Sequence, residues 1–225
     1  MDFGCSDPGA WRDALSSYDK HMESLNNPKL AELDKLYRTE LPRSLHSRTP
    51  TAHITKNELN KVMEWKLTRG KWRPRLLSFV SSLDETSVKT ASQKAFAALP
   101  DLKEAVNALS TLKGVGPATA SAVLAAFDPH IAPFMSDEAM VAALGSSKEY
   151  TLKQYLVFAE KLQNKAKELN SKGQVKEGDN GFFTASDIER ALWSAAAGAK
   201  NVVDMPDGKG RTNLKENGQR KRRKS

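Results

Sequence analysis

The chain has little of what metal clusters and membrane spans require. Cys5 is the single cysteine among 225 residues, which excludes an internal disulfide, a cysteine-held zinc site and a four-cysteine iron–sulfur cluster. The four histidines have no ligand-like spacing. No run approaches the ~18 consecutive apolar residues that a membrane span needs. We therefore expect no metal, no cofactor and no membrane partner.

The body of the chain also lacks an excess of one charge sign, although the net charge is +8. Residues 200–225 hold nine Lys or Arg against three Asp or Glu, a balance of +6, which leaves +2 for the first 199 residues. This tail cannot bury enough apolar surface to offset its ordering entropy, so residues 200–225 are predicted to be disordered. Its closing basic run is typical of nuclear targeting and of binding to an import receptor; the alternative is a solvated tail with nonspecific charge. The run consists of Arg220, Lys221, Arg222, Arg223 and Lys224.

No segment alternates apolar and polar residues for long enough to predict a strand. Helical spacing covers most of the remainder, with starts and stops supplied by capping residues, prolines and glycines. The predicted helices cover 10–25, 28–38, 55–67, 74–80, 88–99, 102–112, 117–127, 136–144, 151–169 and 184–197. The sequence thus predicts an all-α chain of about ten short helices. Residues 1–54 supply N-terminal helices and a connector at 41–53, residues 55–199 form the helical domain with a loop at 170–181, and the tail follows.

Residues 112–120 read Leu-Lys-Gly-Val-Gly-Pro-Ala-Thr-Ala and lie between two predicted helices. Two glycines separated by one residue allow a tight turn that presents backbone amides. Together with the start of the next helix, these amides can bind one backbone phosphate. A dinucleotide fingerprint would need a preceding strand, and the nucleotide phosphate loop G-x-x-x-x-G-K-[ST] is absent. The alternative is a plain turn between two helices.

This pattern resembles the helix-hairpin-helix motif, L-x-G-V-G-x-x-T-A, which holds DNA phosphates without reading base sequence. The resemblance places the motif at about 101–127 and implies DNA contacts at Lys113, Gly114, Val115, Gly116, Ala118 and Thr119. A Cβ at either glycine would obstruct the approach of a phosphate. We therefore expect Gly114→Ala and Gly116→Ala to weaken DNA binding without unfolding the protein.

The segment that follows extends the resemblance to the DNA glycosylases of the helix-hairpin-helix superfamily. In that family a similar stretch ends in a catalytic aspartate at the start of the next helix, the place that Asp137 takes here, 23 residues after Gly114. The resemblance implies that this carboxylate stabilises positive charge on the deoxyribose while the bond to a turned-out base breaks. Asp128 and Glu138 are alternative carboxylates. An acid in a first helical turn is also favoured by the helix dipole alone.

One departure from the family concerns strand cleavage. Bifunctional members carry a lysine two positions after the second glycine, where it forms a Schiff base with the sugar; here this position is Ala118. The resemblance therefore implies a monofunctional DNA N-glycosylase without lyase activity. A non-enzymatic helix-hairpin-helix module, or a helical protein-interaction domain, is the alternative.

Residues 65–75 form the densest basic patch of the body, with five cations, two tryptophans and no acid. Positive charge attracts phosphates, and indole rings stack on exposed bases. The predicted DNA contacts are Lys66, Arg69, Lys71, Trp72, Arg73 and Arg75. Trp65 is predicted to be a core residue. The alternative is that the cations form a solvated rim around buried rings.

Overall fold

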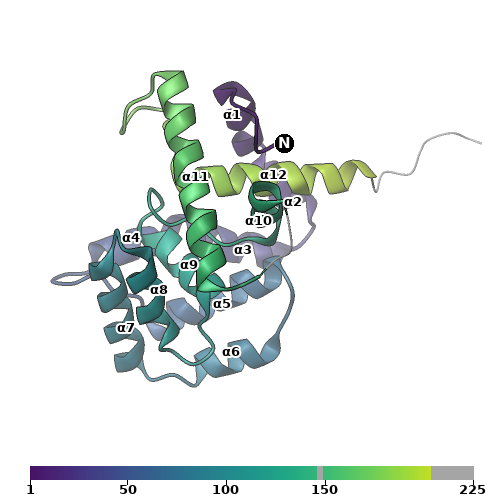
Figure 1. Ribbon diagram of the computed structural model, residues 1–225. Coiled ribbons are helices and arrows are strands. Elements are labelled where there is room, and N and C mark those ends of the chain that lie inside the picture. Colours follow the sequence, from purple (N-terminus) through teal and green to yellow (C-terminus); the bar gives the residue numbers. More distant parts are fainter. Residues whose placement is uncertain (146–148, 204–225) are drawn as a thin grey trace, which may run out of the picture.

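The computed structural model describes residues 1–145 and 149–203. Across these residues the chain forms twelve α-helices, one π-helical turn and no strand (Figure 1), which confirms the predicted all-α class of about ten helices. The elements are α1 (Pro8–Ser16), α2 (Tyr18–Ser24), α3 (Pro28–Lys35), the π turn (Leu36–Glu40), α4 (Leu41–Ser47), α5 (Lys56–Arg69), α6 (Pro74–Ser81), α7 (Glu85–Ala98), α8 (Leu102–Ser110), α9 (Pro117–Phe127), α10 (Asp137–Leu144), α11 (Leu152–Gly173) and α12 (Ala185–Val203). The predicted targeting run, residues 220–224, lies outside the described residues.

Local chemistry sets the start of several helices. At the N-terminus of α5, the Thr55 hydroxyl accepts a hydrogen bond from the Glu58 amide at 3.2 Å, and the Glu58 carboxylate accepts one from the Thr55 amide at 2.9 Å. This reciprocal capping box satisfies two amides that the helix itself leaves without partners. Pro74 and Pro117 begin α6 and α9, where a missing N–H costs nothing.

Three predicted boundaries are wrong. Part of the connector predicted at 41–53 is helical, because the buried side chains of Leu41 and Leu45 hold α4 in the core and the preceding π turn gives room to the Pro42 ring. Helix α11 runs to Gly173, into the loop predicted at 170–181. Helix α12 continues to Val203, past the predicted start of the tail at 200, because each further backbone hydrogen bond extends an existing helix at little cost.

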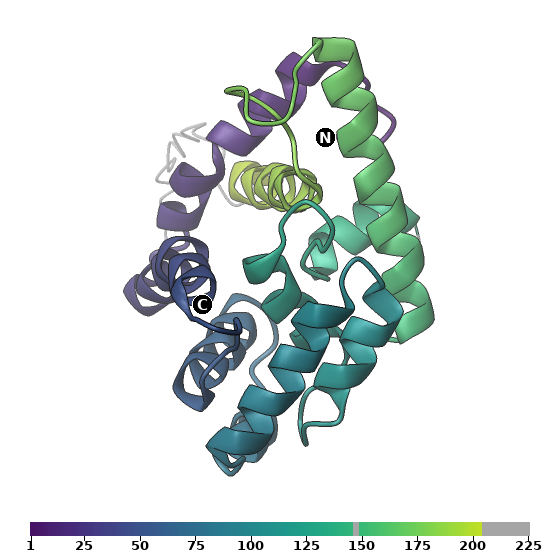
Figure 2. The ribbon, with the colours of Figure 1, turned by 90° about the vertical axis from the view of Figure 1, so that its left-hand side faces the viewer.

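The helices pack in two groups (Figures 1 and 2). One group holds α5 to α9, with α3 and α4 packed against α5 and α9; the other holds α1, α2, α10, α11 and α12. The predicted N-terminal segment 1–54 is therefore divided between the two groups. Helices α1 and α2 pack on α12, whereas α3 packs on α5 and α4 packs on α9. The end of α5, the start of α9 and the start of α10 lie where the groups meet.

Buried polar contacts fix the C-terminal half of α5. The Trp65 ring stacks on Tyr37 with 3.7 Å between centroids, and its indole N–H donates to Asp34 at 2.9 Å. The Tyr18 hydroxyl donates to the same carboxylate oxygen at 2.9 Å. Because a buried polar group is costly without such partners, these bonds define one position for the helix. Trp65 is a core residue, as predicted from the sequence.

Candidate functional site

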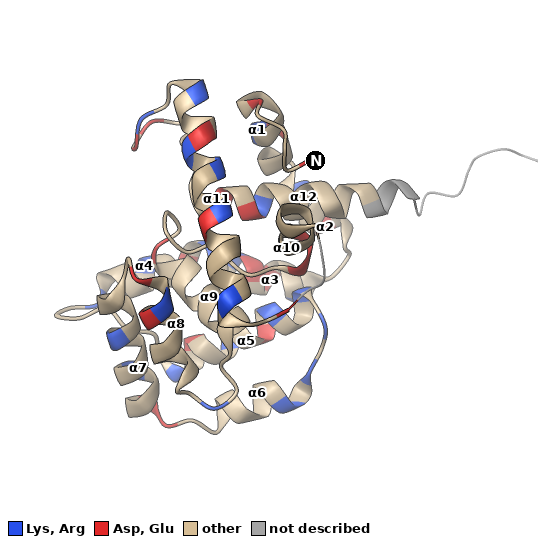
Figure 3. Ribbon diagram, in the orientation of Figure 1, with Lys and Arg blue, Asp and Glu red and all other residues tan. Residues whose placement is uncertain are grey.

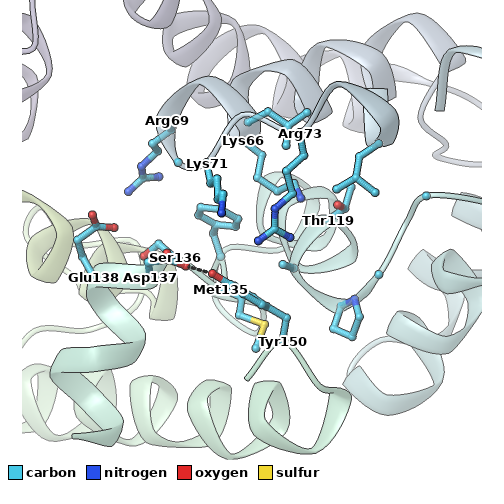
Figure 4. Close-up of a pocket in the computed structure, with 18 residues that line it drawn as sticks. Lys66, Arg69, Lys71, Arg73, Thr119, Met135, Ser136, Asp137, Glu138 and Tyr150 are labelled. Atoms are coloured by element: carbon cyan, nitrogen blue, oxygen red, sulfur yellow. Dashed lines mark hydrogen bonds between the residues drawn. The ribbon is translucent and has the colours of Figure 1, made fainter. Parts of the chain in front are cut away.

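A cavity of about 250 Å³ opens where the two groups of helices meet (Figure 4). Its first wall is the end of α5 with the loop to α6, and the lining residues there are Lys66, Leu67, Arg69, Gly70, Lys71 and Arg73. Its second wall is the turn before α9, residues 114–119. Its third wall is the segment 134–138, which leads into α10, together with Tyr150. The cavity therefore brings together the predicted hairpin, part of the predicted basic patch and Asp137.

The turn between α8 and α9 uses its two glycines differently. Gly114 has a φ of +89°, and a Cβ there would lie 2.8 Å from the Cβ of Phe79, so a side chain is both strained and obstructed. A Cβ at Gly116 would have no neighbour within 4 Å. The first glycine thus shapes the turn, whereas the second leaves the surface open.

The same turn presents backbone donors at the start of α9. The amides of Thr119 and Ala120 each donate to the Gly116 carbonyl at 2.9 Å. The amides of Gly116 and Ala118 donate to no acceptor among the described residues. Such amides lie at the positive end of the helix dipole and can therefore bind an anion.

Three other predicted contacts of the turn differ in exposure. Lys113 is exposed, with its amine 4.6 Å from the centroid of the Phe79 ring. Thr119 is buried and faces the cavity rather than the outer surface. The contact predicted at Val115 stays a prediction: its side chain is buried, and its amide already donates to the Leu112 carbonyl at 3.0 Å.

Asp137 is the first residue of α10 and lies half-buried in the cavity wall beside Glu138. Its Oδ1 accepts a hydrogen bond of 2.5 Å from the Tyr150 hydroxyl, drawn as a dashed line in Figure 4. Asp128 lies elsewhere: its carboxylate accepts the amides of His130 and Ile131 and so shapes the turn after α9. Of the three candidate carboxylates, Asp137 and Glu138 face the cavity.

Tyr150 was not identified from the sequence, where it is only an aromatic residue next to the cap of α11. Tyr150 is 39% exposed, and its ring centroid lies 5.9 Å from the guanidinium carbon of Arg73. Burial, followed by the hydrogen bond and charge of Asp137, raises the pKa of Tyr150 to about 12. The phenol is therefore protonated at neutral pH and remains a hydrogen-bond donor.

The basic wall of the cavity consists of Lys66 on α5 with Lys71 and Arg73 on the loop that follows (Figure 4). In the ribbon of Figure 3, blue marks Lys and Arg along the loop between α5 and α6. Burial, together with the charge of Arg73, lowers the pKa of Lys66 to about 8, although the Asp137 carboxylate acts in the opposite direction. Trp72 is 50% exposed, and Arg75 is exposed on the first turn of α6. Both lie beside the cavity rather than in its wall.

Arg69 does not behave like the rest of the predicted basic patch. Its side chain is 5% exposed and pairs with the buried Glu189 carboxylate of α12 at 3.1 Å. Its guanidinium carbon also lies 4.6 Å from the ring centroid of Trp193. The charge of Arg69 thus joins α5 to α12 in this structure, and its predicted contact with DNA stays a prediction.

Within residues 1–145 and 149–203, no group of three or more His, Cys, Asp and Glu side chains is placed to hold a metal ion. In the same part of the chain, no helix has the length and apolar character to cross a membrane. Comparisons with protein-family models, with curated proteins and with solved structures each return no match.

Proposed function

We propose that the chain binds duplex DNA, with the turn before α9 acting as the hairpin of a helix-hairpin-helix motif, and that it hydrolyses an N-glycosidic bond at Asp137. The observation that carries the proposal is the place of Asp137. It lies in the wall of a cavity bounded by the hairpin on one side and by cations on another.

The hairpin supplies contacts to the DNA backbone. The amides of Gly116 and Ala118 are free to donate to one phosphate, and the N-terminus of α9 adds a favourable dipole. Lys71 and Arg73 add positive charge from the loop across the cavity. These contacts read no base sequence, so they hold the duplex while another part of the site selects the target.

The cavity is suited to a single base. Its volume of about 250 Å³ is slightly below the range of about 300–1,000 Å³ that holds drug-sized ligands. Apolar surface comes from Phe134 and Met135, and the Tyr150 ring is available for stacking. A base turned out of the DNA duplex loses stacking interactions worth a few kcal/mol. Contacts with the apolar surface of the cavity and with the polar groups around it offset this loss.

Asp137 supplies the charge that the reaction needs. As the bond between C1′ and the base nitrogen breaks, its electron pair leaves with the base and positive charge develops on the deoxyribose. A carboxylate beside the sugar stabilises this charge, after which water adds to C1′ and the base takes up a proton. The Tyr150 hydroxyl bonds one carboxylate oxygen at 2.5 Å and holds the group in one orientation. The hairpin has no amine at position 118, so it offers no route to a Schiff base.

The test uses duplexes that carry alkylated, oxidised or deaminated bases. We expect base release from at least one class, scored by alkaline cleavage of the resulting abasic site, and duplex binding whose affinity falls steeply with salt. Absence of duplex binding by fluorescence anisotropy would overturn the proposal. Tight binding without base release from any class would overturn the enzymatic part and support a non-enzymatic DNA-binding module.

We also propose that the chain is nuclear and is bound by an import receptor through Arg220 to Lys224. The uninterrupted basic run at 220–224 supports this. Deleting residues 218–225 from a fluorescent fusion should reduce nuclear accumulation. Equal accumulation with and without these residues would contradict the proposal.

A further inference from the structure

Arg69 places a deeply buried positive charge in the wall of the cavity. Its guanidinium carbon lies 4.6 Å from the ring centroid of Trp193 and 5.3 Å from that of Phe134, which also lines the cavity. With 5% of its side chain exposed, Arg69 is out of reach of a phosphate on the outer surface of a duplex. A group that contacts this guanidinium has to enter the cavity.

The guanidinium of Arg69 has donors that no described residue uses. Nη2 donates to Glu189 at 3.1 Å, the single hydrogen bond from this side chain to residues 1–145 and 149–203. Nε is buried and has no partner in the same part of the chain. A guanidinium carries several N–H donors and no acceptor, and a buried donor without a partner is costly. Arg69 is therefore suited to an acceptor atom of a ligand in the cavity.

Glu138 extends toward Arg69 from the first turn of α10 (Figure 4). The two side chains belong to different walls and lie at the same end of the cavity. Burial opposes the charge of Arg69, but the groups around it, Glu138 among them, raise its pKa above the ordinary value. A carboxylate has several lone pairs on its two oxygens, so Glu138 can accept an N–H in addition to the contacts it already makes. This end of the cavity thus presents a donor next to an acceptor.

We propose that Arg69 and Glu138 select the target base by its lactam edge, a carbonyl next to a ring N–H. Arg69 donates to the carbonyl oxygen, and Glu138 accepts the N–H. The substrate class is then neutral bases such as hypoxanthine and uracil, the deamination products of adenine and cytosine. This inference rests on the proposed function, since a base reaches the cavity only when DNA docks on the hairpin.

The normal bases are excluded in two ways. Adenine and cytosine present the reverse pattern, an amino group next to a ring nitrogen that accepts, so each would place donor against donor at Arg69. A site with buried polar groups rejects a ligand that leaves them without partners. Guanine and thymine share the lactam edge, but in a matched pair they are more costly to turn out than a mismatched base.

The charge of Arg69 also favours a neutral base over an alkylated cation. As the bond to C1′ breaks, its electron pair leaves with the base, and a neutral base takes negative charge that is shared with its carbonyl oxygen. A guanidinium beside that oxygen stabilises the charge. A base that alkylation has made cationic leaves as a neutral molecule, and before that its charge is repelled by Arg69.

The test compares three duplexes of one sequence that carry hypoxanthine, adenine or purine opposite a tetrahydrofuran residue, so that none of the three bases is paired. Purine lacks both the carbonyl and the ring N–H. A 2′-fluorine on the target sugar opposes positive charge there and keeps the base attached, so anisotropy measures binding alone. We expect the full chain to bind the hypoxanthine duplex more tightly than the other two by about tenfold or more.

Two variants assign the preference to the two side chains. Glu138→Ala should bind the hypoxanthine duplex about tenfold more weakly and the purine duplex as before. Arg69→Met combined with Glu189→Gln, which leaves no buried carboxylate without its partner, should do the same. A merely structural role would weaken binding to all three duplexes alike. Glu160→Ala, at an exposed position of α11 outside the cavity wall, should keep the preference. Thermal melts verify folding, and if the double variant unfolds, Glu138→Ala decides.

The outcomes separate this proposal from the proposed function. Equal affinity of the unaltered chain for the hypoxanthine and purine duplexes would overturn the proposal, as would a preference that persists in the Glu138→Ala variant. Release of 3-methyladenine from methylated DNA without release of hypoxanthine or uracil would leave the glycosylase proposal intact and overturn this one. Failure to bind any of the three duplexes would overturn both.

Discussion

The Tyr150 hydroxyl lies 2.5 Å from Asp137 Oδ1 and joins the segment before α11 to the first residue of α10. The carboxylate is thereby held by a neutral donor, since the pKa of Tyr150 is raised to about 12. If Asp137 stabilises charge on the sugar, the orientation of its oxygens matters, and Tyr150 is a positioning residue.

Tyr150→Phe should lower the single-turnover rate of base release by about tenfold or more, the range expected for one hydrogen bond to a charged group. DNA affinity and melting temperature should stay unchanged. The loss should be the same between pH 6 and 9, because the phenol does not titrate in that range. Tyr155→Phe, a buried tyrosine of α11 outside the cavity wall, is the matched control. An unchanged rate in the Tyr150→Phe variant would exclude this role.

Alanine variants of the two hairpin glycines should have different effects, one on the stability of the protein and the other on its affinity for DNA. Gly114→Ala places a Cβ 2.8 Å from Phe79 at a φ of +89°, so it should lower the free energy of unfolding by about 1–3 kcal/mol. This differs from the sequence-based expectation that both glycine variants keep the fold intact. Gly116→Ala has open space and should retain the melting temperature while losing duplex affinity. Thermal melts and anisotropy check both; normal affinity in the Gly116→Ala variant would contradict the proposed phosphate contact.

Arg69 should matter for stability. Arg69→Met leaves the Glu189 carboxylate buried without its partner and should cost about 3–5 kcal/mol in unfolding free energy. Adding Glu189→Gln should recover part of this loss, and Arg75→Met, an exposed arginine, should cost little. Denaturant unfolding measures all three. A normal unfolding free energy for Arg69→Met, with reduced duplex affinity, would contradict this structural role and support the predicted DNA contact of Arg69.

The loop between α5 and α6 should contribute to DNA affinity through its positive charge. Lys71→Ala should weaken binding to all duplexes alike and reduce the slope of log affinity against log salt by about one unit. Lys94→Ala removes an exposed lysine of α7, outside the cavity wall, and should leave affinity and slope unchanged. Salt titrations by anisotropy compare the two variants. Equal slopes for both would show that the loop does not contact phosphate.

Many of the helices could be predicted because the residues that begin and end them are neighbours in the sequence. The capping box of Thr55 with Glu58 and the prolines at the starts of α6 and α9 need no tertiary information. Helix α4 was missed because its order comes from the burial of Leu41 and Leu45 in a distant core, not from periodic spacing. The extension of α11 likewise depends on Asn170, whose side-chain amide bonds the backbone of Phe183 thirteen residues away.

The site could be predicted only in part. The sequence contained the hairpin, Asp137 and most of the cations, yet Tyr150 reaches Asp137 only through tertiary packing. Arg69 was grouped with the exposed cations because charge was counted along the chain, whereas its side chain is buried and pairs with Glu189. It follows the core residue Trp65 by four positions and so shares its buried face. The lowered pKa of Lys66 depends on burial and on Arg73, which no local pattern encodes.

Base release by Asp137→Asn tests the central claim most directly. On the damaged duplex that the unaltered chain processes, this variant should lose about a hundredfold or more of the single-turnover rate. Its duplex affinity should be equal or higher, because a negative charge near phosphates has been removed. Asp128→Asn, which alters a carboxylate in the turn after α9 and outside the cavity wall, should keep the full rate. Undiminished base release by the folded Asp137→Asn variant would contradict the account.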